Sequence, residues 1–423
     1  MPHWPRVGEK SSIKLGLNNI KSLLEALDNP QDKMPPVIHV AGTNGKGSTV
    51  SFLQSILEAS GLRVHVNTSP HIYRFNERIK IGGEEISDRY LKEILEECRI
   101  VSEKNNINTS FFEGITAAAF LAFSRNKADI TLVEVGMGGR LDATNVLTKP
   151  LMTVITPISL DHVESLGDTV EKIAYEKACI MKSGIPSVIS AQLDGAHKVI
   201  EEYASKNKVP LFRYEYDFGI EPNINGGFQY MSDDCKIDLP EPSLKGLHQY
   251  VNAATAIAAV KLIKGGGITD ASISEGIENA KWPGRIEKIN SGKLFDILPD
   301  GSEVYLDGAH NQSGAQVLAT WLSMQPEMRT FMVVGFTKNR NANDFLKYFQ
   351  IMNPNVICST VHSEPLSYKG HELQEMIDCK FPDISSVNKI EEALRRIVSE
   401  NTKPVRVIVS GSLFLVSDFL RAN

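Results

Sequence analysis

The sequence predicts an α/β protein of two domains, each built around a mostly parallel sheet. Short apolar runs rich in β-branched residues alternate with helical stretches over most of the 423-residue chain. Such runs are typical of parallel strands that are buried on both faces and connected by helices. The alternation is interrupted at Trp282–Arg285 and then resumes, which indicates a second domain.

Five apolar runs predict the parallel strands of the first domain: Val37–Val40, Arg63–Asn67, Ile130–Val135, Met152–Thr156 and Val188–Ile189. A glycine-rich loop, Gly42–Gly47, follows the first run, and a helix starts near Ser48 and ends at Gly61. The segment Phe112–Phe123 is alanine-rich and apolar, so we expect a buried helix there.

The region from Leu211 to Pro242 contains an Asn-Gly-Gly turn and several aromatic residues, which predict a small antiparallel excursion. An alanine-rich helix over Val251–Leu262 follows. We place the domain boundary directly after Arg285, which gives domains of residues 1–285 and 286–423. The second is a smaller, Rossmann-like doubly wound domain. Its predicted strands are Val304–Leu306, Phe331–Val334, Val356–Cys358 and Val405–Val409.

The composition is that of a globular protein, with 42% hydrophobic and 23% charged residues. A net charge of −6 argues against nucleic acid and acidic membranes as partners. The five cysteines are scattered without a CxxC pair, so we expect neither a disulfide framework nor a zinc site. The N-terminal residues lack the apolar core of a signal peptide, and no apolar run reaches the length of a membrane span. We expect a cytoplasmic monomer.

The loop Gly42–Gly47 predicts a phosphate site. Its glycines allow backbone N–H groups to turn towards a phosphate, the helix N-terminus adds partial positive charge, and Lys46 adds a full one. The hydroxyl of Ser48 is suited to Mg²⁺. The general pattern G-x-x-x-x-G-K-[ST] is not matched, because Val40 and Gly47 stand where it has Gly and Ser or Thr. A junction that needs glycines only for its geometry is the alternative, but Lys46 between two glycines favours a P-loop ATPase domain that binds ATP.

Two polar residues near strand ends are suited to a metal ion. Glu134 lies near the end of the third predicted strand, at the edge of the sheet where the phosphate loop lies, and its carboxylate can hold Mg²⁺ there. His162 follows the fourth strand by a short loop, which favours metal or phosphate contact. An ordinary surface position is the alternative for both. Gly136–Arg140 resembles a dinucleotide fingerprint, but Leu141 replaces its third glycine, so we reject an NAD site.

Lys177 falls on the apolar face of a predicted helix. Asp168 and Glu171 predict the N-terminal cap of this helix, and Gly184 and Pro186 predict its end. The side chain either extends its amine into water or is partly buried, in which case its pKa falls and the amine becomes reactive. The periodicity leaves both alternatives open.

The second domain contributes another strand–turn–helix junction. Asp307 and His310 follow its first predicted strand and are either helix caps or groups that face a cleft between the domains. Arg285, beside the boundary, could reach the same cleft and clamp a phosphate.

Eight stretches, in order and over nearly the whole chain, resemble the folylpolyglutamate synthase/dihydrofolate synthase family of the Mur ligase superfamily. They are His39–Ser48, Thr68–His71, Phe75–Arg78, Glu134–Asn145, Ser159–His162, Glu176–Ala178, Trp282–Arg285 and Asp307–Asn311. Gly47, which departs from the general phosphate-loop pattern, is this family's form.

The resemblance implies an ATP-dependent amide ligase. Such an enzyme converts a carboxylate of dihydropteroate or a folate into an acyl phosphate, which the amine of L-glutamate then attacks. The implied ATP contacts are Gly45, Lys46, Gly47, Ser48, Asn252, Arg285 and Asp307. Leu141, Asp142 and Ala143 would touch the pterin substrate.

The resemblance also implies two Mg²⁺ ions and allows a monovalent cation. Ser69 and Glu134 would hold the first Mg²⁺, and His162 would serve the second. Lys177 matches the family's carbamylated lysine, whose carbamate is an anion near the second ion. Lys46, His162 and Lys177 are therefore the expected catalytic residues.

Three function classes remain open at this point. The first is the pterin–glutamate ligase, with both synthase activities. The second is a ligase of the same superfamily that acts on a muropeptide; Thr68–His71 and Phe75–Arg78 count against it. The third is a nucleotide-binding regulator or transporter ATPase, which would not require Lys177 or a second domain with Arg285 and Asp307.

Overall fold

The computed structural model describes residues 16–223 and 226–423, which divide into two compact units. The first unit runs to Ser243 and resumes at Gln249–Lys281, and the second contains Leu244–His248 and Trp282–Asn423. The segment Trp282–Arg285 thus belongs to the second unit, whereas the boundary expected from the sequence places it in the first. The reason is local bonding, since the carbonyl of Gly284 accepts a hydrogen bond from Gly308 N–H at 2.9 Å.

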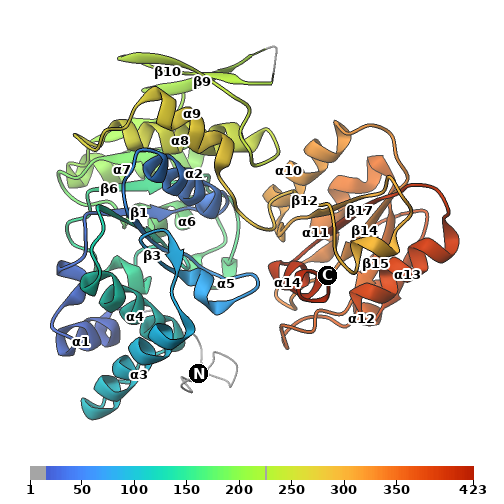
Figure 1. Ribbon diagram of the computed structural model, residues 1–423, viewed down its shortest axis with the longest axis horizontal. Coiled ribbons are helices and arrows are strands. Elements are labelled where there is room, and N and C mark those ends of the chain that lie inside the picture. The colour runs from blue at the N-terminus through green and yellow to red at the C-terminus, as the bar shows by residue number, and fades with distance from the viewer. Residues whose placement is uncertain (1–15, 224–225) are drawn as a thin grey trace. The chain divides into compact units, whose positions relative to one another are not determined.

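The first unit is built on an eight-stranded sheet with the order β4-β3-β2-β5-β1-β6-β7-β8 (Figure 1). All neighbouring strands are parallel except the pairs β2–β3 and β3–β4. The strands are β1 Val37–Ala41, β2 Val64–Asn67, β3 Ile79–Ile81, β4 Glu84–Glu85, β5 Ile130–Glu134, β6 Met152–Ile155, β7 Ser187–Ile189 and β8 Leu211–Arg213. The mostly parallel sheet expected for this domain is confirmed.

The central strands bring their carboxyl ends to one edge of the sheet. Strand β1 is buried over its whole length because it lies between β5 and β6, which suits its apolar sequence. In the register, Val40 lies opposite Glu134, Ala41 opposite Ile155, and Asn67 opposite Val133. Residues that follow β2, β5, β1 and β6 therefore gather at one edge, where ligands of open α/β sheets bind.

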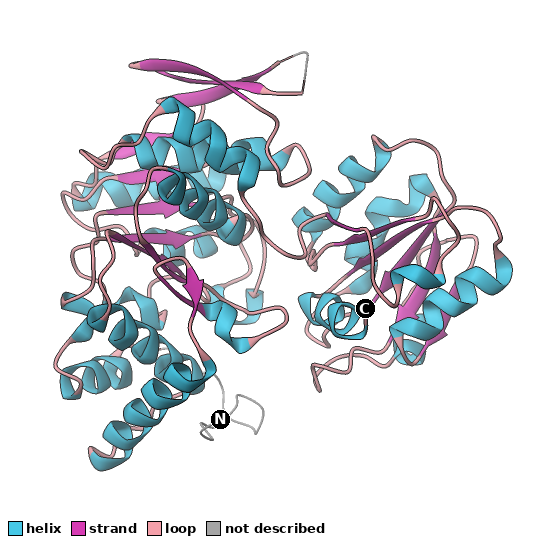
Figure 2. Ribbon diagram, in the orientation of Figure 1, coloured by secondary structure: helices cyan, strands magenta, loops and turns pink. Residues whose placement is uncertain are grey.

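Helices flank the strands of each unit (Figure 2). Those of the first unit are α1 Asn18–Ala26, α2 Lys46–Ala59, α3 Asp88–Lys104, α4 Phe111–Arg125, α5 Val163–Leu166, α6 Val170–Ala178, α7 Asp194–Asn207, α8 His248–Lys261 and α9 Asp270–Asn279. Helix α4 begins with a capping box in which Ser110 and Glu113 bond each other's backbone N–H groups, and it is buried as expected. No helix in the described part of the chain is long and apolar enough to cross a bilayer.

The helix that carries Lys177 is shorter than expected. Its N-cap is Thr169, whose side chain accepts a hydrogen bond from Lys172 N–H at 3.3 Å, whereas Asp168 binds the Lys172 amine at 2.7 Å. The predicted cap at Asp168 is therefore wrong by one residue. The helix α6 ends at Ala178, well before Gly184, so Lys177 lies in its last turn.

The antiparallel excursion begins later than expected, because Leu211–Arg213 forms β8 and pairs in parallel with β7. The three-stranded antiparallel sheet follows it, with the order β11-β10-β9, and β11 contacts α9. Strands β9 and β10 of this sheet are labelled in Figure 1. Its strands are β9 Phe218–Pro222, β10 Phe228–Ser232 and β11 Cys235–Leu239.

The second unit has a six-stranded sheet with the order β12-β13-β17-β14-β15-β16, parallel except for β12. The strands are β12 Glu287–Ile289, β13 Glu303–Leu306, β14 Thr330–Val334, β15 Asn355–Ser359, β16 Ile384–Val387 and β17 Arg406–Ser410. The helices are α10 Gln312–Ser323, α11 Ala342–Leu346, α12 Gly370–Met376, α13 Ile390–Glu400 and α14 Leu413–Ala422. Aromatic residues fill one core of this unit, among them Trp321, Phe336, Phe345 and Phe349. The smaller Rossmann-like unit expected from the sequence is confirmed.

Candidate active site

The phosphate loop connects β1 to α2 and is bonded to the segment that follows β6. Thr43 N–H donates to Pro157 O at 3.0 Å, and the Thr156 hydroxyl donates to Asn44 O at 2.8 Å. The loop and this segment lie so close together that a Cβ on Gly42 would be 1.8 Å from Thr156 Oγ1. Glycine at position 42 is thus required by the contact between two neighbouring strand ends.

Two lysine amines meet at this loop. Lys177 Nζ donates to Gly42 O at 2.8 Å, and Lys46 Nζ donates to the same oxygen at 3.2 Å. The Lys177 side chain is buried, so its amine is not extended into water. Burial, and next the positive charge of Lys46, lower the pKa of Lys177 to about 7, although Asp161, Asp142 and Glu176 oppose the shift. Near neutral pH, Lys177 therefore carries a substantial fraction of uncharged amine.

Ser69 and Glu134 lie together at the ends of β2 and β5. The Glu134 carboxylate is buried and accepts a hydrogen bond from Ser69 N–H at 3.1 Å. The Ser69 hydroxyl oxygen is buried and has no hydrogen-bond partner among the described residues. An unpaired hydroxyl beside a buried carboxylate fits Mg²⁺, which takes oxygen ligands and commonly uses one or two protein groups together with phosphates and water.

Arg78 supplies positive charge behind this pair. Burial lowers the pKa of Arg78 to about 10, and the charges of Glu134 and Glu77 oppose the shift. Its Nε donates to His71 Nδ1 at 2.8 Å. The guanidinium is thus held near Glu134, where it compensates the buried carboxylate.

His162 has a left-handed backbone conformation with φ of 49°, and its N–H donates to Asp161 Oδ1 at 2.8 Å. Its ring Nε2 lies 4.0 Å from the same oxygen. Among the residues that the structure describes, no three His, Cys, Asp or Glu side chains gather into a metal-binding group. A metal at this edge would therefore be held by few protein ligands.

The loop that contains Leu141, Asp142 and Ala143 is organised around the Asp142 carboxylate. Asp142 Oδ1 accepts from Thr144 Oγ1 at 2.6 Å, and Oδ2 accepts from Met137 N–H at 2.9 Å. Because the Thr144 proton is used in this way, the hydrogen bond of 2.9 Å between His39 Nε2 and Thr144 Oγ1 must be donated by the histidine. Burial raises the pKa of Asp142, although these bonds oppose the shift. The carboxylate thus shapes the loop, and a substrate contact by this segment would come from other atoms.

Asn252, on α8, is brought to the phosphate loop. It is buried, and its Oδ1 would lie 2.5 Å from a Cβ on Gly45. Its Nδ2 donates to Gln249 Oε1 at 2.9 Å. The predicted nucleotide residues Gly45 and Asn252 therefore lie against each other.

Arg285 and Asp307 meet within the second unit. Asp307 Oδ2 accepts from Ile286 N–H at 2.9 Å, and Oδ1 accepts from Ala309 N–H at 2.8 Å. Burial raises the pKa of Asp307, and the positive charge of Arg285 opposes the shift. A Cβ on Gly308 would lie 2.7 Å from Arg285 Nη1, so the small residue at 308 makes room for the guanidinium.

Several residues that hold these groups were not predicted. Arg78 lies within, and Thr156 beside, the stretches that resemble the family, but Glu134 and Asn44, on which they act, are distant in sequence. Gln249 could have been noticed as an amide at the start of an otherwise alanine-rich apolar helix. That Gln249 holds Asn252 by a hydrogen bond is seen only in the folded structure.

Replacing Gly45 with alanine is expected to weaken nucleotide binding by at least about tenfold, since the new Cβ would displace Asn252 from the loop. Gly61→Ala is the matched control, because Gly61 has nearly the same φ, +80° against +83°, but no atom within 4 Å of its Cβ position. Each change should cost about 1–2 kcal/mol of stability for the left-handed conformation. The melting temperature measures the loss of stability, and AMPPNP titration measures the loss of nucleotide binding. If Gly45→Ala and Gly61→Ala bound AMPPNP with equal affinity, the proposed contact between the loop and the nucleotide would be contradicted.

Known proteins resemble both units. The chain matches the Mur ligase middle domain over residues 40–260 and the dihydrofolate synthetase C-terminal domain over residues 293–422. The dihydrofolate synthase/folylpolyglutamate synthase of Bacillus subtilis is 33% identical, in an alignment that covers 98% of this chain and 96% of the relative.

Solved structures agree with these matches. E. coli FolC in complex with DHPP and ADP superposes with a TM-score of 0.86 at 27% identity, covering 97% of this chain and 94% of that one. A bifunctional folylpolyglutamate synthase/dihydrofolate synthase with Mn, AMPPNP and L-glutamate bound gives 0.84 at 28% identity, covering 98% and 95%. The chain therefore belongs to the folylpolyglutamate synthase/dihydrofolate synthase family of ATP-dependent glutamate ligases.

Proposed function

We propose that this chain, acting as a monomer, joins L-glutamate to dihydropteroate and to folates through an acyl phosphate. The observation that carries the proposal is the convergence of Lys46 and Lys177 on the Gly42 carbonyl. The Ser69–Glu134 pair lies at the same edge of the sheet. This edge offers phosphate-binding groups, a carboxylate for a metal and a reactive amine together.

In the first step, a substrate carboxylate oxygen attacks the γ-phosphorus of ATP, and the bond to ADP breaks. In the second, the amine of L-glutamate attacks the acyl carbon and loses a proton, and phosphate leaves. Backbone N–H groups of Gly45–Ser48 would hold the ATP phosphates, and Lys46 would neutralise charge on the transferred group. Arg285 and Asp307 are proposed to bind the nucleotide from the second unit.

Ser69 Oγ and Glu134 would hold a divalent cation, with His162 serving a second one. Mg²⁺, when bound, neutralises phosphate charge and orients the oxygens of the transferred group. A relative with Mn and AMPPNP bound supports a divalent metal at such a site. The monovalent cation allowed by the family resemblance is kept as part of the proposal.

Lys177 is proposed to be carbamylated. Its uncharged Nζ would attack the carbon of CO₂, form a C–N bond and release a proton. Two observations support this: the amine is buried, and its pKa is lowered to about 7. The product is an anion, so the repulsion between Lys177 and Lys46 would become attraction.

Ligase activity is expected to depend on CO₂ most strongly at low pH. Because the pKa of Lys177 is about 7, the amine is mostly uncharged above that pH and mostly protonated below it. At about pH 6 roughly nine amines in ten carry a proton and cannot attack CO₂. Activity of CO₂-depleted enzyme, measured at about pH 6 and about pH 8 with equal concentrations of dissolved CO₂, should recover to a smaller extent at the lower pH. Equal recovery at both would contradict the carbamate.

The proposed reaction is tested by phosphate release from ATP in the presence of L-glutamate, with and without dihydropteroate and then with tetrahydrofolate. We expect release only when both the glutamate and a pteroyl substrate are present. If phosphate were released at the same rate with and without both co-substrates, the protein would be a nucleotide hydrolase instead of a ligase.

A further inference from the structure

Gln249 is a buried polar side chain whose hydrogen bonds are incomplete. It has no exposed surface, and it lies in the first turn of α8, three residues before Asn252. Its Oε1 accepts the hydrogen bond from Asn252 Nδ2 at 2.9 Å. Its Nε2, which carries two protons, is buried without a hydrogen-bond partner in residues 16–223 and 226–423.

This bond determines which end of the Asn252 amide faces the phosphate loop. Because Nδ2 is used towards Gln249, the other end, Oδ1, lies against Gly45. Without Gln249, the amide of Asn252 could rotate and present N–H groups instead. The orientation of a predicted ATP contact therefore depends on a residue outside the eight stretches that resemble the family.

Among the three buried polar side chains of α8, Gln249, Asn252 and Thr255, Gln249 is the one with a buried polar atom that lacks a partner in the described part of the chain. Buried positions on the helix are mainly apolar, including Ala253, Ala254, Ile257 and Val260. A buried amide donor without a partner costs about 1–3 kcal/mol, which an apolar residue of similar size would avoid. Holding Asn252 uses only Oε1, so the Nε2 donor at the other end of the same amide is left for a ligand oxygen.

We infer that Gln249 is a nucleotide-positioning residue: its Oε1 fixes Asn252, and its Nε2 donates to an oxygen of bound ATP. The inference rests on the proposed function, since it assumes that ATP binds at the phosphate loop.

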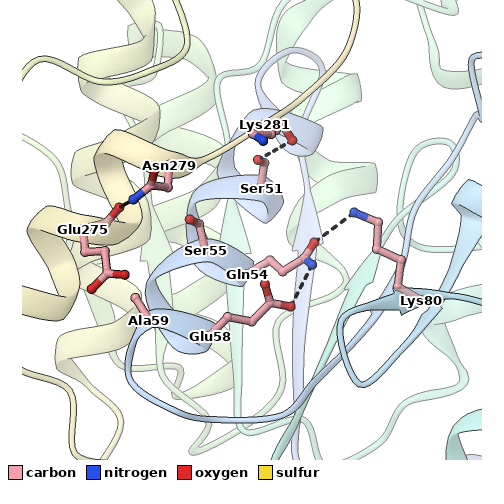
Figure 3. Close-up of a pocket in the computed structure, with 9 residues that line it drawn as sticks. All are labelled: Ser51, Gln54, Ser55, Glu58, Ala59, Lys80, Glu275, Asn279 and Lys281. Atoms are coloured by element: carbon pink, nitrogen blue, oxygen red, sulfur yellow. Dashed lines mark hydrogen bonds between the residues drawn. The ribbon is translucent and has the colours of Figure 1, made fainter.

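A cavity on the outer side of α2 provides a contrast and a control (Figure 3). It has a volume of about 480 Å³ and lies between α2, α9 and Lys80 of β3. Here the glutamine amide is satisfied: Gln54 Oε1 accepts from Lys80 Nζ at 3.2 Å, and Nε2 donates to Glu58 Oε1 at 2.8 Å. Gln54 therefore offers the same side chain in the same unit, with both ends of its amide paired.

The test compares Gln249→Glu with Gln54→Glu. The change at 249 keeps an oxygen that accepts from Asn252, removes the Nε2 donors and adds negative charge near the phosphates. We expect the Kd for AMPPNP with Mg²⁺ and the KM for ATP to rise at least about tenfold, which corresponds to the loss of one good hydrogen bond. The KM for L-glutamate should stay within about twofold, and Gln54→Glu should leave all three constants within about twofold.

Gln249→Met keeps the length of the side chain without its polar atoms and serves if the glutamate variant does not fold. AMPPNP affinities within twofold of wild type in whichever variant is folded would overturn the inference. So would equal increases in the KM values for ATP and L-glutamate, because a general structural defect would produce them. If the wild-type chain itself failed to bind AMPPNP, the proposed function would be wrong, which is a separate outcome.

Discussion

Replacing Lys177 with alanine is expected to lower ligase turnover at least roughly 10²–10³-fold, the range for loss of one preorganised group that stabilises a transition state. The wild-type amine contacts Gly42 O beside Lys46, so its loss alters the charge at the phosphate loop directly. The melting temperature should change much less, because the buried amine is itself costly to desolvate and its removal offsets part of the cavity left behind. Steady-state rates and thermal melts measure both quantities.

Lys172→Ala is the matched control for this change. Lys172 lies on the same helix, is exposed, and pairs with Asp168 at 2.7 Å, so we expect nearly wild-type rates. A short-chain carboxylic acid such as acetate should restore part of the activity of Lys177→Ala, since it can supply the missing anion. Wild-type turnover in Lys177→Ala would refute the catalytic role.

Replacing Glu134 with glutamine should raise the Mg²⁺ concentration for half-maximal activity roughly 10–100-fold. The substitution removes the negative charge beside the Ser69 hydroxyl and leaves Glu77 alone to compensate the nearby Arg78. The fold should survive, because glutamine still offers an oxygen to Ser69 N–H. Magnesium titrations of ligase activity, together with thermal melts, test this expectation.

Glu58→Gln is the control for the loss of one carboxylate from the first unit. Glu58 lines the outer cavity of Figure 3, where Gln54 Nε2 bonds its carboxylate, and we place it outside the site. Its Mg²⁺ titration should match the wild type. If the titration of Glu134→Gln matched as well, Glu134 would not be a metal ligand.

The fold class could be predicted because buried parallel strands have a strong sequence pattern. The run Val37–Ala41 is apolar at nearly every position since β5 and β6 cover both its edges and helices cover its faces. Strands without that pattern were not expected. Strand β12 has only three residues and pairs antiparallel at an edge, and β16 contains two serines and is only partly buried.

The site residues that could be predicted are those with a local sequence pattern, whereas those that depend on contacts in the fold could not. Glycine-rich motifs and strand-end carboxylates are local signals, and parallel register brings Glu134 beside the phosphate loop. Periodicity could not decide whether the amine of Lys177 is buried, because only the packing of α6 against the loop buries it. Gln249 was missed because its significance lies in one hydrogen bond and one missing partner, neither of which a sequence displays.

Activation of a substrate carboxylate as an acyl phosphate precedes formation of the amide in the proposed reaction. It is tested most directly with dihydropteroate whose carboxylate oxygens are labelled with ¹⁸O, incubated with the protein, ATP, Mg²⁺ and L-glutamate. If the acyl phosphate forms, the carboxylate oxygen that attacked phosphorus leaves with it, and each phosphate released carries one ¹⁸O for each amide made. Unlabelled phosphate alongside amide product would contradict the acyl phosphate, and labelled phosphate without any amide would contradict the ligase.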